Sequence, residues 1–425
     1  MASIKGFAEW LPEQQILQQE IIDNIRHSFE LNGYAPLLTR SIELLEDLLN
    51  QGETDKEIYG VQRLSADSDT PSDWGLHYDL TVPFARYVSE NRGKIVFPYR
   101  RYQIQQAWRG ERPQMGRFRE FIQADADVVN EGDLDLRFDA EVILMFSQVL
   151  SSLSVPKIKI LVNNRKLLEG FYRGLGIENI VGVLRIVDKL PKIGEEEVAR
   201  LLQESGLSSQ QAQNCIGLTK IEAKDSAELK NISKFGVSHD MLDLGVRELG
   251  EVLDRVNLFA ESGSVVAGLH IARGFDYYTG TVVESAFVDH PEVGSVCSGG
   301  RYDNLISTGS KPIPGVGLSI GVSRLLAYCF HLDLIETNRQ SPAQVFIVVN
   351  SEEERTDSEK VAALLRDRDI SAVVSDSSAA YGKQIKLAER LGIENVWFPN
   401  SDGSHEVKNL ETREQIKADP TSWLL

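Results

Sequence analysis

The sequence between residues 100 and 127 constrains the fold most, because apolar and polar residues alternate there along two stretches. The stretches run from about residue 101 to 111 and from 117 to 128, and glycines and a proline interrupt the chain between them. One face of the second stretch is mostly apolar, and the other carries Arg117, Arg119, Phe121, Gln123, Asp125 and Asp127. A period of two residues predicts an antiparallel pair of strands with one packed face and one polar, aromatic face.

The composition of the 425-residue chain is typical of a soluble globular protein of two or three domains, with 42% hydrophobic and 25% charged residues. No apolar run is long enough to span a bilayer, and the first residues do not resemble a secretory signal. The three cysteines are far apart and lack metal-ligand spacing. We therefore expect a reduced, cytoplasmic protein without a membrane partner. The net charge of −18 argues only weakly against nucleic-acid binding, because a local basic patch is sufficient.

The order of periodic segments predicts an α+β fold in two domains. Residues 1–333 form the first domain, an antiparallel sheet flanked by helices and interrupted by a charged helical insertion at about 163–266. The polar segment 334–344 contains a proline and indicates a linker. In residues 345–425, short apolar strands alternate with helices, which predicts a small α/β domain with a mostly parallel sheet.

Two short segments indicate a polar pocket. The octapeptide 273–280 places a cation, a carboxylate, two phenols and a hydroxyl between glycines, and the segment 297–303 combines Cys, Ser, Gly, Arg, Tyr and Asp. Unpaired polar groups are costly in a core, so these segments favour the wall of a site that holds an anion beside a flat group. The segment 76–82 alternates as a strand does and places His77, Asp79 and Thr81 on one face.

Several arginines are candidates for holding a triphosphate. Arg109, Arg112, Arg117 and Arg119 cluster near the hairpin turn, and Arg273, Arg301 and Arg324 follow later. A guanidinium binds phosphate oxygens bidentately, and charge stabilisation is what a displacement at phosphorus requires. The alternative for any one of them is a surface salt bridge. The chain has no Walker-type loop, which argues against a P-loop enzyme.

The carboxylates leave two interpretations open. Asp79, Asp127 and Glu111, which shares the face of Arg109, can bind a cationic or N–H-bearing group, or can pair with neighbouring arginines. His77 and His270 have no second ligand at metal-binding spacing, so we expect no protein-held metal site. Farther along, Lys383, Lys386 and Arg390 share one helix face, which is either a nucleic-acid contact or a solvated surface.

Taken together, the motifs resemble those of the histidyl-tRNA synthetases, a family of class II aminoacyl-tRNA synthetases. Residues 109–114 with 116–121 are similar to class II motif 2, and residues 317–325 to motif 3. Residues 273–278 and 299–303 resemble the two histidine-specific motifs, and residues 78–83 resemble the amino-acid-binding segment. The likeness covers nearly the whole chain. Motifs 2 and 3 are shared by all class II enzymes, so the two histidine-specific motifs are what point to this family.

The resemblance implies a role for each matching residue in binding ATP, with Mg²⁺, and L-histidine. Arg109 would hold the α-phosphate, Arg117 and Arg324 the outer phosphates, and Arg273 both the histidine carboxylate and the α-phosphate. Arg109, Arg273 and Arg324 would be the catalytic groups. Phe121 would stack on adenine, and Glu111 would contact the nucleotide. The remaining histidine-binding residues would be Asp79, Thr81 and Gln123 at the α-ammonium group, and Asp127, Tyr277 and Tyr278 around the imidazole.

The implied function is that of a homodimeric ligase that forms histidyl-adenylate and then esterifies the 3′ end of tRNA(His). The C-terminal domain would bind the anticodon, with Lys383, Lys386 and Arg390 as candidate contacts. Two alternatives stay open: a non-catalytic regulatory paralogue of histidine biosynthesis, and a class II synthetase for another amino acid. The chain departs from the family pattern at Arg40, where motif 1 usually has a proline, at Asp127 and Ser323, where glutamate is usual, and at Phe275, where leucine is frequent.

Overall fold

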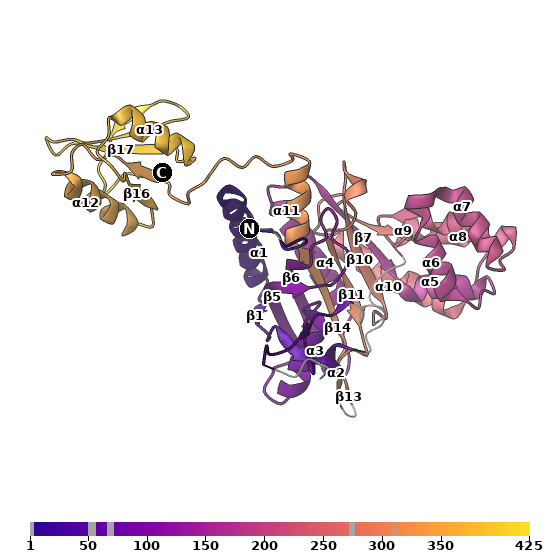
Figure 1. The fold of residues 1–425 in the computed structure, drawn as a ribbon. Coiled ribbons are helices and arrows are strands. Elements are labelled where there is room, and N and C mark those ends of the chain that lie inside the picture. Colours follow the sequence, from indigo (N-terminus) through magenta and orange to yellow (C-terminus); the bar gives the residue numbers. More distant parts are fainter. Residues whose placement is uncertain (1–3, 50–56, 66–71, 272–276, 309–310) are drawn as a thin grey trace. The chain divides into compact units, whose positions relative to one another are not determined.

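The computed structural model describes residues 4–49, 57–65, 72–271, 277–308 and 311–425. Its contacts divide the chain into two compact units, which are treated separately below. The first comprises Met1–Ala8 and Ile22–Ile335, and the second comprises Glu9–Ile21 and Glu336–Leu425. Figure 1 shows the helices and strands of both units.

A nine-stranded sheet forms the centre of the first unit. Its neighbouring strands are antiparallel except at the β1–β5 and β7–β9 junctions. Its strands, in spatial order, are β1 (Ala35–Pro36), β5 (Tyr99–Trp108), β6 (Glu120–Val129), β14 (Gly315–Gly321), β11 (Cys297–Tyr302), β10 (Thr281–Phe287), β7 (Ile158–Asn164), β9 (Val265–Gly268) and β8 (Glu222–Ala223). The predicted α+β fold with an antiparallel sheet is therefore confirmed.

Helices cover this sheet and supply its core. The helices outside the insertion are α1 (Pro12–Leu31), α2 (Leu45–Leu48), α3 (Thr81–Asn91), α4 (Arg137–Ser152) and α11 (Val322–His331). Phe29 near the end of α1 packs on Phe146 of α4 and on Tyr102 of β5, with ring centroids 5.3 and 5.8 Å apart. All three rings are buried, and such aromatic contacts stabilise a sheet–helix interface beyond the area that they bury.

The chain between β7 and β9 is mainly helical. It contains α5 (Arg165–Gly174), α6 (Ile180–Val187), α7 (Leu190–Glu204), α8 (Ser209–Thr219), α9 (Ser226–Leu229), the 3₁₀ helix η2 (Lys230–Phe235) and α10 (Asp240–Val256). Helices α5 and α10 cross closely at two glycines. A Cβ atom on Gly170 would lie 2.1 Å from the Leu242 backbone nitrogen, and one on Gly245 would lie 2.2 Å from the Leu167 nitrogen. Glycine is required at both positions for this crossing.

Three further small elements complete the first unit. A three-stranded sheet joins β2 (Ile42–Leu44), β4 (Trp74–Leu76) and β3 (Gly60–Val61). A two-stranded ribbon joins β12 (Ser307–Thr308) and β13 (Lys311–Pro312), and a 3₁₀ turn, η3, spans Pro291–Val293.

The second unit contains a five-stranded sheet with apolar clusters on both faces. Its strands, in spatial order, are β16 (Ala372–Val374), β15 (Val345–Ile347), β17 (Asn395–Pro399), β18 (His405–Asn409) and β19 (Gln415–Lys417). Helices α12 (Arg355–Arg366) and α13 (Tyr381–Arg390) connect the parallel strands. The expectation of a mostly parallel sheet holds for the first three strands only, because β18 and β19 return as antiparallel hairpins.

Three predicted strands have other ends than the sequence pattern indicated. The strand predicted for residues 76–82 ends at Leu76, and helix α3 begins at Thr81. Asp79 accepts a hydrogen bond from the Val82 backbone N–H at 3.0 Å, which satisfies one of the free donors at the helix start. In the hairpin, β5 ends at Trp108 and β6 starts at Glu120, so the arginine-rich residues between them form the connection.

Candidate active site

A cavity of about 470 Å³ opens on the polar face of the nine-stranded sheet. The hairpin connection, β6, the start of α3, and parts of β10, β11, β14 and α11 contribute to its wall. Ten of the predicted site residues line it: Asp79, Thr81, Arg109, Glu111, Arg117, Phe121, Gln123, Tyr277, Tyr278 and Arg324. The structure thus brings together residues that are up to 245 positions apart in the sequence, from Asp79 to Arg324 (324 − 79).

Arg109 and Phe121 form one side of the cavity. The Arg109 guanidinium lies 5.1 Å from the centroid of the Phe121 ring, and its Nε donates to the Tyr78 carbonyl at 3.0 Å. The two side chains come from opposite sides of the hairpin connection, and the Arg109 backbone N–H donates to the Arg119 carbonyl at 2.9 Å. The ring attracts the cation, so Arg109 and Phe121 place a positive charge and an aromatic surface next to each other in the cavity wall.

Arg117 and Arg324 bring further positive charge to the cavity. Arg117 lies 3.5 Å from a Glu111 carboxylate oxygen and is partly exposed, so this ion pair is weak. Arg324 stands in the first turn of α11 and donates to the Val293 carbonyl at 3.0 Å. Its Nε is buried without a hydrogen bond, and burial together with nearby Arg117 lowers its pKa. Among the described residues no carboxylate forms an ion pair with Arg324, so an anion bound here would gain from both guanidinium groups.

The opposite end of the cavity has carboxylate, amide and hydroxyl groups. Asp79 is buried, and its second oxygen lies 3.5 Å from the Tyr277 hydroxyl. Burial raises the pKa of Asp79, and the Val82 N–H and Arg109 act in the opposite direction. Gln123 donates to the Ser319 hydroxyl at 2.7 Å, while its Oε1 is buried without a partner. This end of the cavity can bind a small group with several N–H donors.

Two adjacent tyrosines form an aromatic wall at this end. The rings of Tyr277 and Tyr278 meet edge to face at 4.8 Å, and Tyr277 meets the Tyr302 ring edge to face at 6.2 Å. Burial raises the pKa of both hydroxyls, so they stay protonated and can donate hydrogen bonds at neutral pH.

Asp127 does not line the cavity. Its side chain is 2% exposed, lies 2.7 Å from Arg101, and accepts a hydrogen bond from the Tyr302 hydroxyl at 2.8 Å. Its carboxylate also lies against Gly317, on which a Cβ atom would be 2.0 Å from Oδ1. Burial raises the pKa of Asp127, and Arg101 opposes this effect.

Asp125 lines the cavity in its place. It is 3% exposed, and its Oδ1 has no hydrogen-bond partner among the described residues. Burial raises its pKa to about 7, and Arg101 opposes the shift. Alternation along the chain placed Asp125 on the polar face, but no role was predicted for it. The signal that points to it is its position two residues after Gln123, on the same face of β6.

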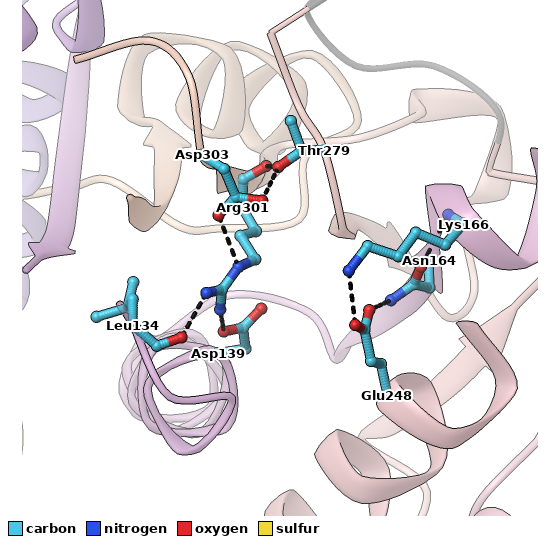
Figure 2. A network of polar contacts seen from close by, with 8 residues as sticks. All are labelled: Leu134, Asp139, Asn164, Lys166, Glu248, Thr279, Arg301 and Asp303. Atoms are coloured by element: carbon cyan, nitrogen blue, oxygen red, sulfur yellow. Dashed lines mark hydrogen bonds and ion pairs between the residues drawn. The ribbon is translucent and has the colours of Figure 1, made fainter. Parts of the chain in front are cut away.

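In a second set of charges, around Arg301, the cation has its carboxylate partners within the protein, although Asp139 Oδ1 is buried without a hydrogen bond to any described residue. Arg301 donates to Asp139 at 2.8 Å, to Asp303 at 3.1 Å and to the Leu134 carbonyl (Figure 2). Asp303 in turn accepts a hydrogen bond from the Thr279 hydroxyl at 2.6 Å, directly after Tyr278 in the chain. Burial raises the pKa of Asp139 to about 6, and Arg301 opposes the shift. Arg301 therefore supports the tyrosine segment and does not face the candidate active site.

The structure also accounts for two residues that the sequence left open. Ser323, which replaces the usual glutamate before Arg324, accepts a hydrogen bond from the Ile122 backbone N–H at 2.9 Å and so ties α11 to β6. The ring nitrogens of His77 lie 3.2 Å from the Arg40 carbonyl and 2.7 Å from the Gln106 carbonyl, so this histidine joins two backbone segments.

Other predicted site residues lie elsewhere. Arg273 and Phe275 fall outside the described residues. Lys383, Lys386 and Arg390 are exposed on α13 of the second unit, as their spacing predicted. In the described ranges no group of three or more His, Cys, Asp or Glu side chains has an arrangement suited to a metal ion. The described helices include none with the length and apolar character needed to cross a membrane.

An antiparallel sheet with one arginine directly after strand β5 and another in the first turn of helix α11, both lining one polar cavity, is typical of a class II aminoacyl-tRNA synthetase. The sequence model of histidyl-tRNA synthetase matches residues 6–325. The chain belongs to the histidyl-tRNA synthetase family.

Three known proteins illustrate the likeness. The histidine–tRNA ligase of Micrococcus luteus is 48% identical over 439 residues, which cover 99% of this chain and 96% of that protein. The crystal structure of histidyl-tRNA synthetase from Nostoc sp. PCC 7120 has a TM-score of 0.88 at 32% identity and covers 98% of this chain and 96% of its own. An ATP phosphoribosyltransferase regulatory subunit/histidyl-tRNA synthetase from Bacillus halodurans has a TM-score of 0.74 at 19% identity, covers 94% of this chain and 98% of its own, and shares the fold.

Proposed function

We propose that this chain is a histidine–tRNA ligase, which activates L-histidine with ATP and transfers it to the 3′ end of tRNA(His). The observation that carries the proposal is the single cavity that gathers an arginine-rich end and an end rich in carboxylate, amide and phenol groups. The first end suits a nucleoside triphosphate, and the second suits an amino acid with a polar ring.

At the nucleotide end, adenine stacks on Phe121, and Arg109 binds the α-phosphate. Arg117 and Arg324 bind the outer phosphates. The carboxylate of histidine attacks the α-phosphorus in line, the bond to the β-phosphate breaks, and pyrophosphate leaves. The arginines contribute orientation and preorganised charge, which are the main sources of rate in phosphoryl-type displacements. We also assign Arg273 to the histidine carboxylate and the α-phosphate, as in the related family motif.

Magnesium would enter with ATP. It favours phosphate oxygens together with one or two carboxylates, and Glu111 and Glu284 line the cavity near Arg324. When bound, the ion neutralises charge on the phosphate groups. Glu111 lies 3.5 Å from Arg117, so its carboxylate offsets part of the positive charge at the nucleotide end of the cavity.

At the amino-acid end, Asp79, Thr81 and Gln123 surround the α-ammonium group. The Gln123 Oε1 without a partner is an acceptor for it, and the buried carboxylate of Asp79 supplies the opposite charge. Tyr277 and Tyr278 enclose the ring of histidine. In the second step the terminal hydroxyl of tRNA attacks the carbonyl carbon of the adenylate, and AMP leaves.

The second unit is proposed to bind the anticodon of tRNA(His). Lys383, Lys386 and Arg390 form a basic stripe on the exposed face of α13, and no ion pair from them to a described residue is present. A chain with a net charge of −18 can bind a polyanion where such a local stripe exists. The three cysteines are buried and unpaired, which supports a cytoplasmic location.

We also propose a homodimer, formed through the region around the three-stranded sheet. Leu38, Ile42, Leu44 and Trp74 are large apolar residues that stay exposed there, and Leu44 pairs with Trp74 across the β2–β4 ladder. Exposed apolar groups that cluster favour an interface. Arg40, in place of the usual proline, pairs with Glu43 at 2.8 Å. Sedimentation of the full chain gives the state directly, and a species of 47.5 kDa at micromolar concentration would contradict the proposal.

Pyrophosphate exchange with each of the twenty amino acids tests the activity. Exchange that depends on histidine alone is expected. Exchange with a different amino acid would establish the alternative class II synthetase. Absence of exchange would favour the regulatory paralogue, which the retained α/β unit and histidine-specific motifs argue against.

A further inference from the structure

The family pattern assigns Asp127 as the hydrogen-bond acceptor for the imidazole ring of a bound histidine, but Asp127 does not line the cavity. A neutral imidazole has one N–H donor and one nitrogen acceptor, and a site that distinguishes histidine must pair both. Both oxygens of Asp127 are already engaged, one by Arg101 and the other by Tyr302. Asp127 is also absent from the cavity wall, so its carboxylate faces Arg101 and Tyr302 and not the space in which a ligand would bind.

We propose that Asp125, and not Asp127, accepts the hydrogen bond from the imidazole N–H of the substrate and so determines specificity for histidine. The proposal rests on the proposed function of the same cavity. Asp125 lines the cavity, is 3% exposed, and keeps Oδ1 without a partner among the described residues. A buried acceptor without a partner costs free energy unless a ligand completes it, which favours a ligand that donates a hydrogen bond.

The register of the hairpin explains why the two aspartates differ. Arg101 of β5 stands directly opposite Asp127, whereas Gln103 stands opposite Asp125. The Gln103 amide nitrogen donates to Thr39 at 2.9 Å and to Gln105 at 2.6 Å, so it has no donor left for Asp125. The cation of β5 is thereby committed to one aspartate, and the other stays open toward the cavity.

The neighbouring strand β14 holds Asp125 in place without blocking it. Ser319 stands opposite Asp125 in the ladder and accepts a hydrogen bond from Gln123, so its hydroxyl hydrogen is directed to the Asp125 carboxylate. This interaction occupies one oxygen of Asp125 and orients the other. Ser319 thus connects Gln123, which binds the α-ammonium group, with Asp125, which binds the imidazole.

The donor that completes the site is the hydroxyl of Tyr278, which lines the same end of the cavity. With Asp125 as acceptor at one ring nitrogen and Tyr278 as donor at the other, the site selects the neutral imidazole and fixes its tautomer. A ring of equal size without an N–H would leave Asp125 buried and unpaired. Discrimination on the order of 10⁴-fold is typical of such sites.

The test compares the full-length chain with the variants Asp125→Asn, Asp125→Ala and Asp127→Asn, with Asp133→Asn as the matched control. Asp133 is an exposed carboxylate six residues beyond Asp127. Pyrophosphate exchange is measured with L-histidine and with thiazolylalanine, an amino acid whose ring is similar in size to imidazole but lacks an N–H. Circular dichroism of each variant confirms folding, and the KM for ATP reports on the nucleotide end.

We expect Asp125→Ala to raise the KM for histidine roughly 10- to 150-fold, the range for losing a hydrogen bond to a charged group. The KM for ATP stays within about twofold, because the nucleotide end is intact. The preference for histidine over thiazolylalanine should collapse in both Asp125 variants and persist in Asp133→Asn.

Retained preference in the Asp125 variants, or its loss in Asp127→Asn alone, would overturn the proposal. If the unaltered chain shows no histidine-dependent exchange, the proposed function itself fails. If the unaltered chain is active and the Asp125 variants keep their preference, only the assignment of Asp125 fails.

Discussion

Two polar cavities lined by described residues of the first unit can be compared, and the larger of the two is not the candidate active site. The cavity beside Arg301 measures about 580 Å³, and the one with the predicted site residues about 470 Å³. In the larger cavity Arg301 pairs with Asp139 and Asp303, and Lys166 lies 2.6 Å from Glu248 (Figure 2). Its cations therefore have their counter-charges already.

The smaller cavity contains polar atoms that the protein does not satisfy. In the described part of the chain, Arg324 Nε, Gln123 Oε1 and Asp125 Oδ1 are buried there without hydrogen bonds. Buried polar groups are normally paired, so a concentration of exceptions in one place indicates a ligand site. Beside the larger cavity, Asp139 Oδ1 is the one such atom among the described partners of Arg301, so the two cavities differ in how many buried polar atoms lack a hydrogen bond.

The strongest test of this difference is Arg324→Ala, which removes an arginine without a carboxylate partner. We expect the kcat of pyrophosphate exchange to fall roughly 10³-fold, the upper range for losing a preorganised donor to developing charge. Stability should change little, because no ion pair is lost and the buried Nε disappears. Exchange rates and thermal melts of the full chain check both parts. Activity within a factor of ten of the unaltered chain would contradict the assignment.

The converse test is Arg301→Met, which removes a fully paired arginine. Asp139 then remains buried with no counter-charge, and breaking a buried pair costs about 3–5 kcal/mol. A large fall in melting temperature is therefore expected. Arg92→Met, which removes a half-exposed partner of Glu131, is the matched control and should cost about 1 kcal/mol or less. Equal melting temperatures for the two variants would show that the Arg301 network contributes no more than a surface pair.

A smaller effect is expected from pH, because burial raises the pKa of Asp125 to about 7. Below that value the carboxyl gains a proton and loses its charge, so it becomes a weaker acceptor for the imidazole N–H. From pH 8 to pH 6 the apparent affinity for histidine should fall about tenfold. Asp79, Arg101, Asp127, Tyr278 and Cys297 are the charged and titratable groups around Asp125.

The free imidazole of the substrate titrates in the same range, with a pKa of about 6.5. The pH profile of Asp125→Asn isolates that contribution, since the variant keeps the substrate but loses the carboxyl. The affinity of the unaltered chain for histidine should fall more steeply on lowering the pH than that of Asp125→Asn, and the difference is the contribution of Asp125. Superimposable profiles would show that Asp125 does not titrate in the working range.

The same strand shows how far the sequence could predict the site. Alternation along β6 placed Gln123, Asp125 and Asp127 on one face, and the structure bears out the shared face. Alternation does not define the register of the hairpin. A shift of two residues would place Arg101 opposite Asp125 and leave Asp127 open, with no change in either pattern. The 11-residue connection from Arg109 to Arg119 determines the register, and the sequence pattern had assigned its first three and last three residues to the strands.

Asp79 shows a second limit of the same kind. The period of two through Leu76–Val82 predicted a strand, but Pro83 and the Asp79 side chain favour a helix start. The prediction that Asp79 and Thr81 belong to the pocket did not depend on the strand, and both line the cavity. Residue type and motif therefore predicted membership of the site better than local periodicity predicted the backbone.

The smallest expected effect concerns charges that are unpaired but lie outside any cavity. Lys383 is exposed on α13, and its two basic neighbours on the same face keep the local potential positive. Lys383→Glu should raise the KM for tRNA(His) about three- to tenfold, since losing or reversing one phosphate contact costs on the order of 1 kcal/mol. Pyrophosphate exchange, which does not involve tRNA, should be unaffected. The matched control is Lys360→Glu on α12, where Lys360 already pairs with Asp357 at 2.8 Å. If both variants raise the KM equally, the effect comes from net charge. If neither does, α13 is a solvated face, and exposure without a partner is no sign of a ligand site.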